Sequence, residues 1–223
     1  MPSPHLHIIG HELCPYVQRA VITLLELGMA YDRTDIDLDH KPDWLIGLTP
    51  TGKIPILVVN NDSVLFESNV IAEYLIELGP CSLLPVGALE RGQHRAWIAY
   101  ADQILDVIAD IIYRAQTRKE LDQAFGKISA MLDMLEMQLA IGGVFGGPEF
   151  RLIDVVYATV FRFFQVLGPL SHIDLCCERP KLKSWKASLA DRPSVKSAVP
   201  DSFNTLLLQF IAGKQSFAAT QVG

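Results

Sequence analysis

The order of apolar and polar positions predicts an α/β domain at the start of the chain. A short apolar run from Leu6 to Ile9 predicts a strand, and apolar residues at helical spacing predict a helix over Pro15 to Leu27. A second strand is expected over Tyr31 to Asp37, which completes a β-α-β unit.

A hairpin and a helix are predicted next. The β-rich runs Ile54 to Val59 and Val64 to Phe66 flank the turn residues Asn60 to Ser63, a pattern that predicts a β-hairpin. Ser68 begins a helix whose apolar positions extend to Leu78. The element order is therefore β-α-β followed by β-β-α.

The rest of the chain predicts helices alone. Glycine and proline between Gly79 and Gly87 interrupt both neighbouring patterns and indicate a linker. We therefore expect an α/β domain at residues 1–78, a linker at 79–88 and an all-helical domain at 89–223. The helices predicted for the second domain are Glu90 to Arg114, Lys119 to Ile141, Ile153 to Leu167 and Pro180 to Ala190. Glycine and proline at Gly142-Gly143 and Gly146-Gly147-Pro148 separate the second of these helices from the third.

Composition narrows the classes of function. Half of the 223 residues are hydrophobic and the net charge is −6, which argues against electrostatic binding of nucleic acid. The longest apolar candidate, Val155 to Leu170, contains Arg162 and Gln165 and predicts a buried helix rather than a membrane span. The first residues lack a signal-peptide pattern, so a cytoplasmic location is expected.

Three of the four cysteines are predicted to have no catalytic role. Cys81, Cys176 and Cys177 are expected to be free packing or surface thiols, because the last two are neighbours and a reducing compartment disfavours disulfides. No metal site is predicted, since His7 and His11 are separated by a strand end and a turn rather than placed on one helix face.

Cys14 differs because it stands where a strand gives way to a helix. Pro15 suits the first helical position, where a missing N–H costs nothing. The positive end of a helix favours a thiolate, so we expect this thiol to titrate below about pH 8.5. The alternative is an inert, buried small residue.

Three motifs together resemble the cytosolic glutathione transferases. They are Cys14-Pro15-Tyr16, the segment Gly52 to Leu57, and Glu67-Ser68 at the start of the helix after the hairpin. The resemblance covers essentially the whole chain and implies a thioredoxin-like domain followed by a helical domain. The cysteine, together with His40 to Trp44, is similar to the omega-like, cysteine-type members.

The resemblance also implies a set of glutathione contacts. The peptide bond before Pro55 is expected to be cis, which leaves the backbone of Ile54 to pair with the cysteinyl part of glutathione. Ser68 is expected to bind the γ-glutamyl carboxylate, Glu67 the amino group, and Lys41 the glycyl carboxylate. The alternatives are a helix cap for Ser68 and a solvated surface cation for Lys41.

Two departures from known patterns stand out. Arg151 occupies the position where this family usually has the Ser or Thr of a capping box with Asp154. Val17 occupies the position of the second cysteine of a glutaredoxin C-x-x-C motif, so an internal disulfide cycle is closed to Cys14.

The resemblance implies a glutathione-dependent thiol transferase or dehydroascorbate reductase in which Cys14 forms a mixed disulfide with glutathione, the co-substrate. It also implies a homodimer. Alternatives are conjugation, isomerisation or reductive cleavage of a specific metabolite, or a noncatalytic regulator that uses the same fold. The small electrophilic or disulfide substrate is expected to bind near Tyr16, Trp97, Tyr100 and Ile104, although the last three lie on a helical stripe whose usual meaning is core.

Overall fold

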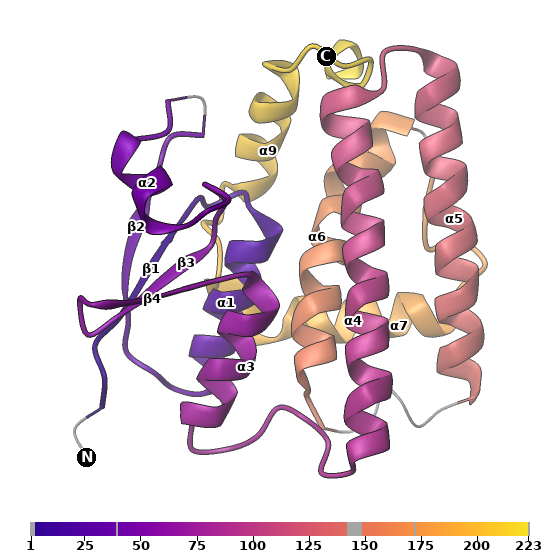
Figure 1. Ribbon diagram of the computed structural model, residues 1–223. Coiled ribbons are helices and arrows are strands. Elements are labelled where there is room, and N and C mark those ends of the chain that lie inside the picture. The colour runs from indigo at the N-terminus through magenta and orange to yellow at the C-terminus, as the bar shows by residue number, and fades with distance from the viewer. Residues whose placement is uncertain (1–2, 39, 142–148, 172, 223) are drawn as a thin grey trace. The chain divides into compact units, whose positions relative to one another are not determined.

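The computed structural model describes residues 3–38, 40–141, 149–171 and 173–222 (Figure 1). The chain forms two compact units, Met1–Leu83 with Pro193–Pro200, and Leu84–Arg192 with Asp201–Gly223. The predicted linker is thus divided between the units after Leu83. Residues 193–200, which the sequence analysis placed in the helical domain, belong to the first unit.

The first unit is built on a four-stranded mixed sheet. Its strands are β1 (Leu6–Gly10), β2 (Asp32–Asp35), β3 (Ile56–Val59) and β4 (Ser63–Phe66), in the spatial order β2-β1-β3-β4. β1 pairs in parallel with β2 and antiparallel with β3, and β3 and β4 form the predicted hairpin. The predicted strands are confirmed, with shorter ends.

Helices cover the sheet of this unit. α1 (Pro15–Glu26) packs against α3 (Ser68–Leu78), and both contact the sheet (Figure 1). α2 (Asp43–Leu48) was not predicted, because six residues are too few to show a helical period. It is held by Leu45, which is fully buried in a cluster with Ile9, Ile36 and Ile56.

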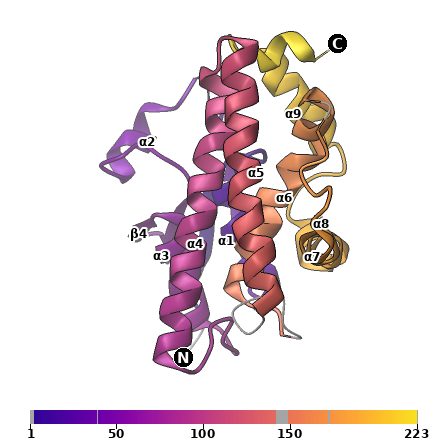
Figure 2. The same cartoon turned by 90° about the vertical axis from the view of Figure 1, so that its right-hand side faces the viewer.

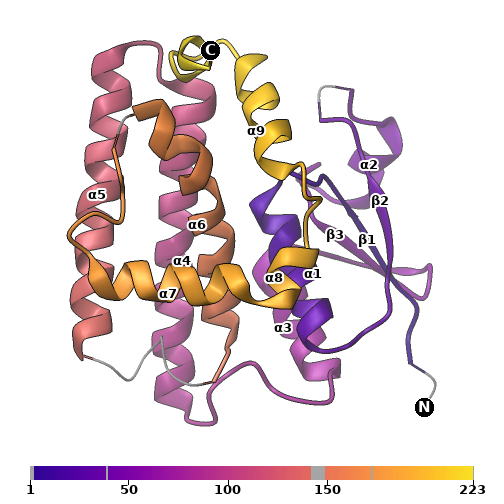
Figure 3. The same cartoon turned by 180° about the vertical axis from the view of Figure 1, so that it is seen from behind.

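The short helix α8 (Pro193–Ser197) lies against α1 (Figure 3). Val195 is 4% exposed, and the Ser194 hydroxyl donates a hydrogen bond to the Glu26 carboxylate of α1. Burial of these side chains on α1 places the segment in the first unit, although it is distant in sequence.

The second unit is helical, and within the described ranges no strand follows Phe66. The four predicted helices are confirmed, while the predicted glycine breaks at 142–143 and 146–148 lie outside the described residues. A π-helical turn, Asp110–Arg114, directly follows α4, and a 3-10 turn, Ala218–Gln221, follows α9. The helices of this unit are α4 (Ala88–Ala109), α5 (Arg118–Ile141), α6 (Leu152–Ser171), α7 (Pro180–Asp191) and α9 (Phe203–Ala212).

Within this unit α6 is the core helix. It packs against α4, α7 and α9, while α4 and α5 lie side by side (Figure 2). The stretch Leu152–Leu170 is long and apolar enough to cross a membrane, but 83% of it is buried inside the protein. It is the buried helix that the sequence predicted.

The Arg151–Asp154 pair completes half of a capping box at the start of α6. The Arg151 N–H donates to Asp154 Oδ2 at 2.9 Å, and Asp154 Oδ1 accepts from the indole N–H of Trp185 on α7 at 2.7 Å. The other half of a capping box, a Ser or Thr hydroxyl at position 151, is missing, as the sequence indicated. The second carboxylate oxygen of Asp154 accepts from Trp185.

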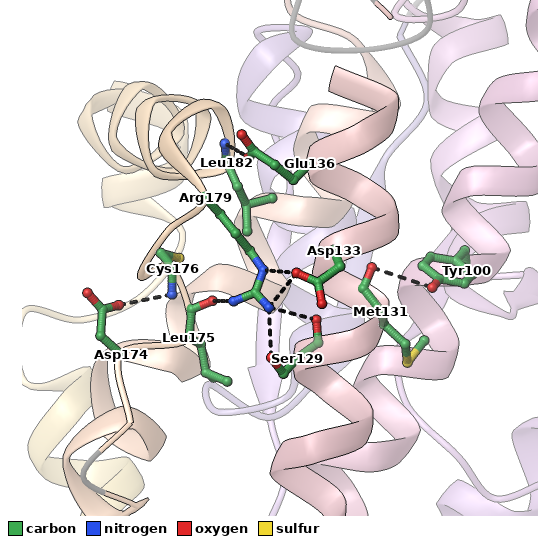
Figure 4. Close-up of polar contacts among 10 residues, drawn as sticks. All are labelled: Tyr100, Ser129, Met131, Asp133, Glu136, Asp174, Leu175, Cys176, Arg179 and Leu182. Carbon is green, nitrogen blue, oxygen red and sulfur yellow. Dashed lines mark hydrogen bonds and ion pairs between the residues drawn. The ribbon is translucent and has the colours of Figure 1, made fainter. Parts of the chain in front are cut away.

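Arg179 connects the turn before α7 to α5 (Figure 4). Its guanidinium contacts Asp133 Oδ1 at 2.6 and 2.8 Å and donates to the Ser129 carbonyl at 3.0 Å and hydroxyl at 2.7 Å. It also donates to the Leu175 carbonyl at 2.9 Å. Five contacts to one planar group fix this junction.

The first turn of α7 is capped by a carboxylate from α5. Glu136 accepts from the backbone N–H group of Lys181 at 3.1 Å and from that of Leu182 at 2.7 Å, the second of which is drawn in Figure 4. A negative charge at this end of a helix satisfies amides that have no acceptor within the helix and complements its dipole.

Candidate active site

The predicted glutathione-site segments meet at one end of the sheet in the first unit, where β1 and β4 end and β3 begins. Ile9, Ile56 and Phe66 form a continuous row across β1, β3 and β4. Directly beyond this row lie the loop from β1 to Cys14, the Ile54–Pro55 bond before β3, and Glu67-Ser68 after β4. Antiparallel pairing therefore gathers three segments that are far apart in sequence.

Cys14 is the residue that caps α1. It adopts extended backbone angles, φ −75° and ψ 119°, and Pro15 follows at the first helical position. The Cys14 N–H donates to the His11 carbonyl at 3.0 Å, and the Cys14 carbonyl accepts from the Gln18 N–H at 3.1 Å. The residue as a whole is partly exposed. The predicted strand-to-helix junction is confirmed.

The prediction of a lowered pKa for Cys14 is wrong. Burial of the thiol raises its pKa above the ordinary value. The backbone N–H groups of Val17 and Tyr16 and the charge of Arg19 oppose this effect but do not outweigh it. The helix end acts in the predicted direction, but desolvation of the anion is the larger contribution.

The Ile54–Pro55 peptide bond is cis, as the resemblance implied. Pro55 is buried, whereas Ile54 is partly exposed at the edge of the α2 cluster. The exposed Lys41 donates from Nζ to the Gly52 carbonyl at 3.3 Å, so it lies beside the segment that leads to Ile54. Lys41 and Ile54 thus belong to one corner of the unit.

Glu67 and Ser68 form the start of α3. Glu67 has a positive φ of 69°, a conformation that costs energy for a residue with a side chain and concentrates at functional sites. Glu67 is exposed, whereas Ser68 is 6% exposed. The residue that caps α3 is Glu67, not Ser68, and it makes no side-chain cap hydrogen bond.

Sequence reasoning missed Arg19, which connects α1 to α3. The residue is fully buried, and its Nη1 donates to Ser68 Oγ at 3.0 Å and to Asn69 Oδ1 at 2.6 Å. An arginine within an amphipathic helix gave no signal, because arginine is usually exposed. Its guanidinium lies at the start of α3, and its charge favours the anionic form of the Cys14 thiol.

The predicted second-substrate residues have different surroundings. Ile104 is fully buried, which matches the core meaning of the stripe and gives it no surface for a substrate. Tyr100 donates to the Met131 carbonyl of α5 at 3.4 Å (Figure 4), and its ring meets the ring of Trp97 edge-on at 5.2 Å. Tyr16 lies in the first unit, 5.4 Å from the Arg19 guanidinium carbon. Roles for Tyr16, Trp97 and Tyr100 in substrate binding stay predictions.

The other thiols are free, as predicted: Cys176 is buried, and Cys81 and Cys177 are exposed. Among the residues that the structure describes, no group of three or more His, Cys, Asp or Glu side chains is placed to hold a metal ion. Cys14 is the cysteine at the end of the sheet where the other candidate residues meet.

Family models match both parts of the chain. A model described as the glutathione S-transferase N-terminal domain matches residues 13–78, and one described as the C-terminal domain of the same family matches residues 118–185. Together these two matches cover more than half of the chain, and the first contains every candidate glutathione-binding residue.

Relatives and solved structures extend the likeness to nearly the whole length. The chain is 25% identical over 221 residues to glutathione S-transferase omega-1 of Sus scrofa, covering 94% of this chain and 88% of that protein. It is 27% identical over 192 residues to glutathione S-transferase U28 of Arabidopsis thaliana, covering 84% and 85%.

Among solved structures, the tau-class glutathione S-transferase of mango, Mangifera indica, superimposes with a TM-score of 0.79 at 26% identity, covering 92% of this chain and 98% of that one. Glutathione transferase Omega 1C of Trametes versicolor shares the fold with a TM-score of 0.76 at 20% identity, covering 95% and 98%.

Proposed function

Because the chain belongs to the glutathione S-transferase family, we propose that it is a cysteine-type transferase in which Cys14 forms and releases a mixed disulfide with glutathione. One observation carries the proposal: a partly exposed cysteine caps α1 at the end of the sheet where the cis Ile54–Pro55 bond and Ser68 also lie. A tyrosine or serine at this position has no sulfur with which to make that bond.

The reaction proceeds in two thiol–disulfide exchanges. The Cys14 thiolate attacks the glutathione sulfur of a glutathionylated substrate, forms a Cys14–glutathione disulfide and releases the substrate thiolate, which takes up a proton. The thiolate of a second glutathione then attacks the glutathione sulfur of this adduct, releases oxidised glutathione and restores the Cys14 thiolate. Val17 stands where a second cysteine resolves such adducts internally, so the external thiol is required.

The raised pKa of Cys14 affects how this cycle starts. Because burial disfavours the anion, the thiol holds its proton more tightly than an ordinary cysteine. Attack therefore requires that the thiol first release this proton. The backbone amides of Tyr16 and Val17 favour the resulting anion.

Glutathione is proposed to bind along the same end of the sheet. The backbone of Ile54 pairs with the cysteinyl part, and the start of α3 at Ser68 binds the γ-glutamyl carboxylate. Glu67 is exposed and free to reach the γ-glutamyl amino group, while Lys41 is placed for the glycyl carboxylate. Replacement of Ser68 by Ala removes a charge-assisted hydrogen bond worth about 1.5–3 kcal/mol, which weakens binding roughly tenfold or more.

The omega-like assignment is supported by Cys14 itself and by the likeness to omega-1 of Sus scrofa. Conjugation of glutathione to an electrophile is the second candidate, since relatives of the U series are about as similar. Reduction of dehydroascorbate or of a mixed disulfide, without conjugation activity, distinguishes the first candidate from the second.

The decisive experiment uses a variant with Cys81, Cys176 and Cys177 replaced by Ser, which leaves Cys14 as the single thiol. Incubation with oxidised glutathione should add one glutathionyl group to Cys14, and reduced glutathione should remove it. Further replacement of Cys14 by Ser should abolish both the adduct and thiol-transferase turnover. Full turnover by the Cys14→Ser protein would refute the mechanism.

We also propose a homodimer and a cytoplasmic location, which the family resemblance and the reducing chemistry of the site support. Light scattering during size-exclusion chromatography measures the first, and cell fractionation measures the second. A monomer at micromolar concentration contradicts the homodimer.

A further inference from the structure

A cavity of about 320 Å³ lies between the end of α6, the segment that follows it and α7. This volume is at the lower end of the range of about 300–1,000 Å³ that is typical of small-molecule sites, so it suits a metabolite rather than a peptide. Phe164, Gly168 and Pro169 of α6 line the cavity together with Lys186 of α7. Every described residue of its lining belongs to the second unit, whereas Cys14 and the candidate glutathione contacts belong to the first.

The segment after α6 is held in place by backbone contacts. The Ile173 N–H donates to the Gly168 carbonyl at 3.3 Å. A Cβ at position 168 would lie 3.2 Å from the Ile173 carbonyl oxygen, so glycine allows the segment to approach α6 this closely. Asp174 Oδ1 then accepts from the Cys176 N–H at 2.9 Å (Figure 4). This wall of the cavity is therefore formed before any ligand binds.

The deeper part of the lining is apolar. Phe164 and Leu175 are 4% and 2% exposed, and both line the cavity. Pro169 and Ile173 also line it and are exposed, Ile173 by 40%. An apolar ligand group that covers these side chains is removed from water together with them, which favours binding. The cavity therefore suits an aliphatic or aromatic group.

The lining also carries one positive and one negative side chain. Lys186 is half-buried, and in the part of the chain that the structure describes it has no hydrogen-bond or ion-pair partner. One oxygen of Asp174 accepts from Cys176, which leaves the other oxygen for a ligand. Burial raises the pKa of the Cys176 thiol, the charge of Lys186 lowers it and the charge of Asp174 raises it, so both charges lie near one buried sulfur. An ammonium and a carboxylate thus accompany an apolar surface.

We propose that this cavity binds a small zwitterion with an apolar group, which is the chemistry of an α-amino acid with an aliphatic or aromatic side chain. The ligand carboxylate pairs with Lys186, its ammonium pairs with Asp174, and its side chain covers Phe164. A ligand with only one of these charges meets a like charge in the lining, which weakens its binding. The site binds its ligand without a covalent step, and the inference does not depend on the proposed function of Cys14.

A saturation-transfer NMR titration of the full chain tests the ligand class, with L-phenylalanine as the probe. Saturating S-methylglutathione is present, because the γ-glutamyl part of glutathione is itself an amino acid zwitterion and its site must be occupied. L-Phenylalanine should bind. Phenethylamine, which lacks the carboxylate, 3-phenylpropionate, which lacks the ammonium, and glycine, which lacks the apolar side chain, should each bind at least tenfold more weakly.

Two variants locate the binding site. Lys186→Met keeps most of the apolar stem and removes the ammonium, so it should weaken L-phenylalanine binding at least tenfold and bind phenethylamine no worse than wild type does. Asp174→Asn keeps an oxygen for the Cys176 N–H and should remove most of the preference for L-phenylalanine over 3-phenylpropionate. Lys183→Met makes the same change at an exposed position of α7 outside the lining and should bind as wild type does.

Three results would overturn the inference. The first is a wild-type protein that does not bind L-phenylalanine, and the second is a wild-type protein that binds 3-phenylpropionate equally well. The third is equal binding of L-phenylalanine by Lys186→Met and Lys183→Met, which would place the amino acid elsewhere. None of these results bears on the Cys14 adduct with oxidised glutathione, so the proposed function is tested separately.

Discussion

Replacement of Asp154 by Ala should strongly destabilise the helical unit, because this carboxylate connects α6 to α7. Asp154 is 5% exposed, and its two oxygens accept from the Arg151 N–H at 2.9 Å and from the Trp185 indole at 2.7 Å. Alanine removes both acceptors and leaves both donors in place. The indole donor is in a buried contact that water does not reach.

The expected magnitude follows from these two contacts. A buried donor without an acceptor, such as the Trp185 indole, costs about 1–3 kcal/mol, and the part-buried Arg151 N–H costs less because water can reach it. Removal of a desolvated carboxylate offsets part of this cost, since burial also raises the Asp154 pKa. We therefore expect a loss of about 1–3 kcal/mol, a sizeable share of a typical unfolding free energy of about 5–15 kcal/mol.

The pH dependence of this loss has a definite sign. Burial is the main cause of the raised pKa of Asp154, while the Arg151 N–H, the Trp185 indole and the Arg192 charge oppose it. Because the folded state binds this proton more tightly, the proton-linked part of the stability that Asp154 contributes is complete below its ordinary pKa of about 3.9. That part is lost as pH rises through the raised pKa, while the two hydrogen bonds remain, so the difference between wild type and Asp154→Ala should be larger at pH 4 than at pH 8.

Urea unfolding followed by tryptophan fluorescence measures the effect at fixed protein concentration, with Asp106→Ala as the control. Asp106 is an exposed carboxylate on α4, and its replacement should change the free energy of unfolding by less than about 0.5 kcal/mol. If Asp154→Ala is as stable as this control, the two hydrogen bonds do not stabilise the unit and the reasoning is wrong.

Further measurements test other parts of the structure. Gly10→Ala places a Cβ 2.5 and 2.6 Å from the methyl groups of the buried Val17, so it should lower the free energy of unfolding by about 1–3 kcal/mol and slow Cys14 alkylation. The control Gly92→Ala has open space around it and should leave the unfolding free energy unchanged or raise it, as measured for both variants by urea unfolding. Arg179→Lys loses the planar guanidinium that binds the Ser129 and Leu175 carbonyls, so it should lower the unfolding free energy by about 1–2 kcal/mol. Because Asp133 is 62% exposed, its ion pair with Arg179 contributes little, and high salt should change this loss little. A loss that high salt abolishes would contradict the role given to the two carbonyl contacts. The alkylation rate of Cys14 in the ligand-free protein should still rise above pH 8.5, because burial raises the thiol pKa, and a midpoint well below pH 8.5 contradicts the burial argument.

Local patterns in the sequence were sufficient for most of the secondary structure. The apolar run before Cys14, the helical spacing after it and the turn at Asn60 to Ser63 each act within a few residues, so they predicted β1, α1 and the hairpin. The same reasoning missed α2 and α8, which are only six and five residues long, and it also missed the ten-residue helix α9. Leu45 and Val195 hold α2 and α8 through burial on distant elements, and no local pattern encodes such a contact.

The sequence by itself determined where the chemistry lies: Cys14 before Pro15, the bond before Pro55, and Ser68 at a helix start all follow from residues adjacent in the chain. The tertiary structure decided how that chemistry is tuned. Burial outweighs the helix end at the Cys14 thiol, and Arg19 is enclosed between α1 and α3 with its guanidinium on Ser68. The physical reason is that desolvation depends on everything that surrounds a group, whereas capping and periodicity depend only on its neighbours along the chain.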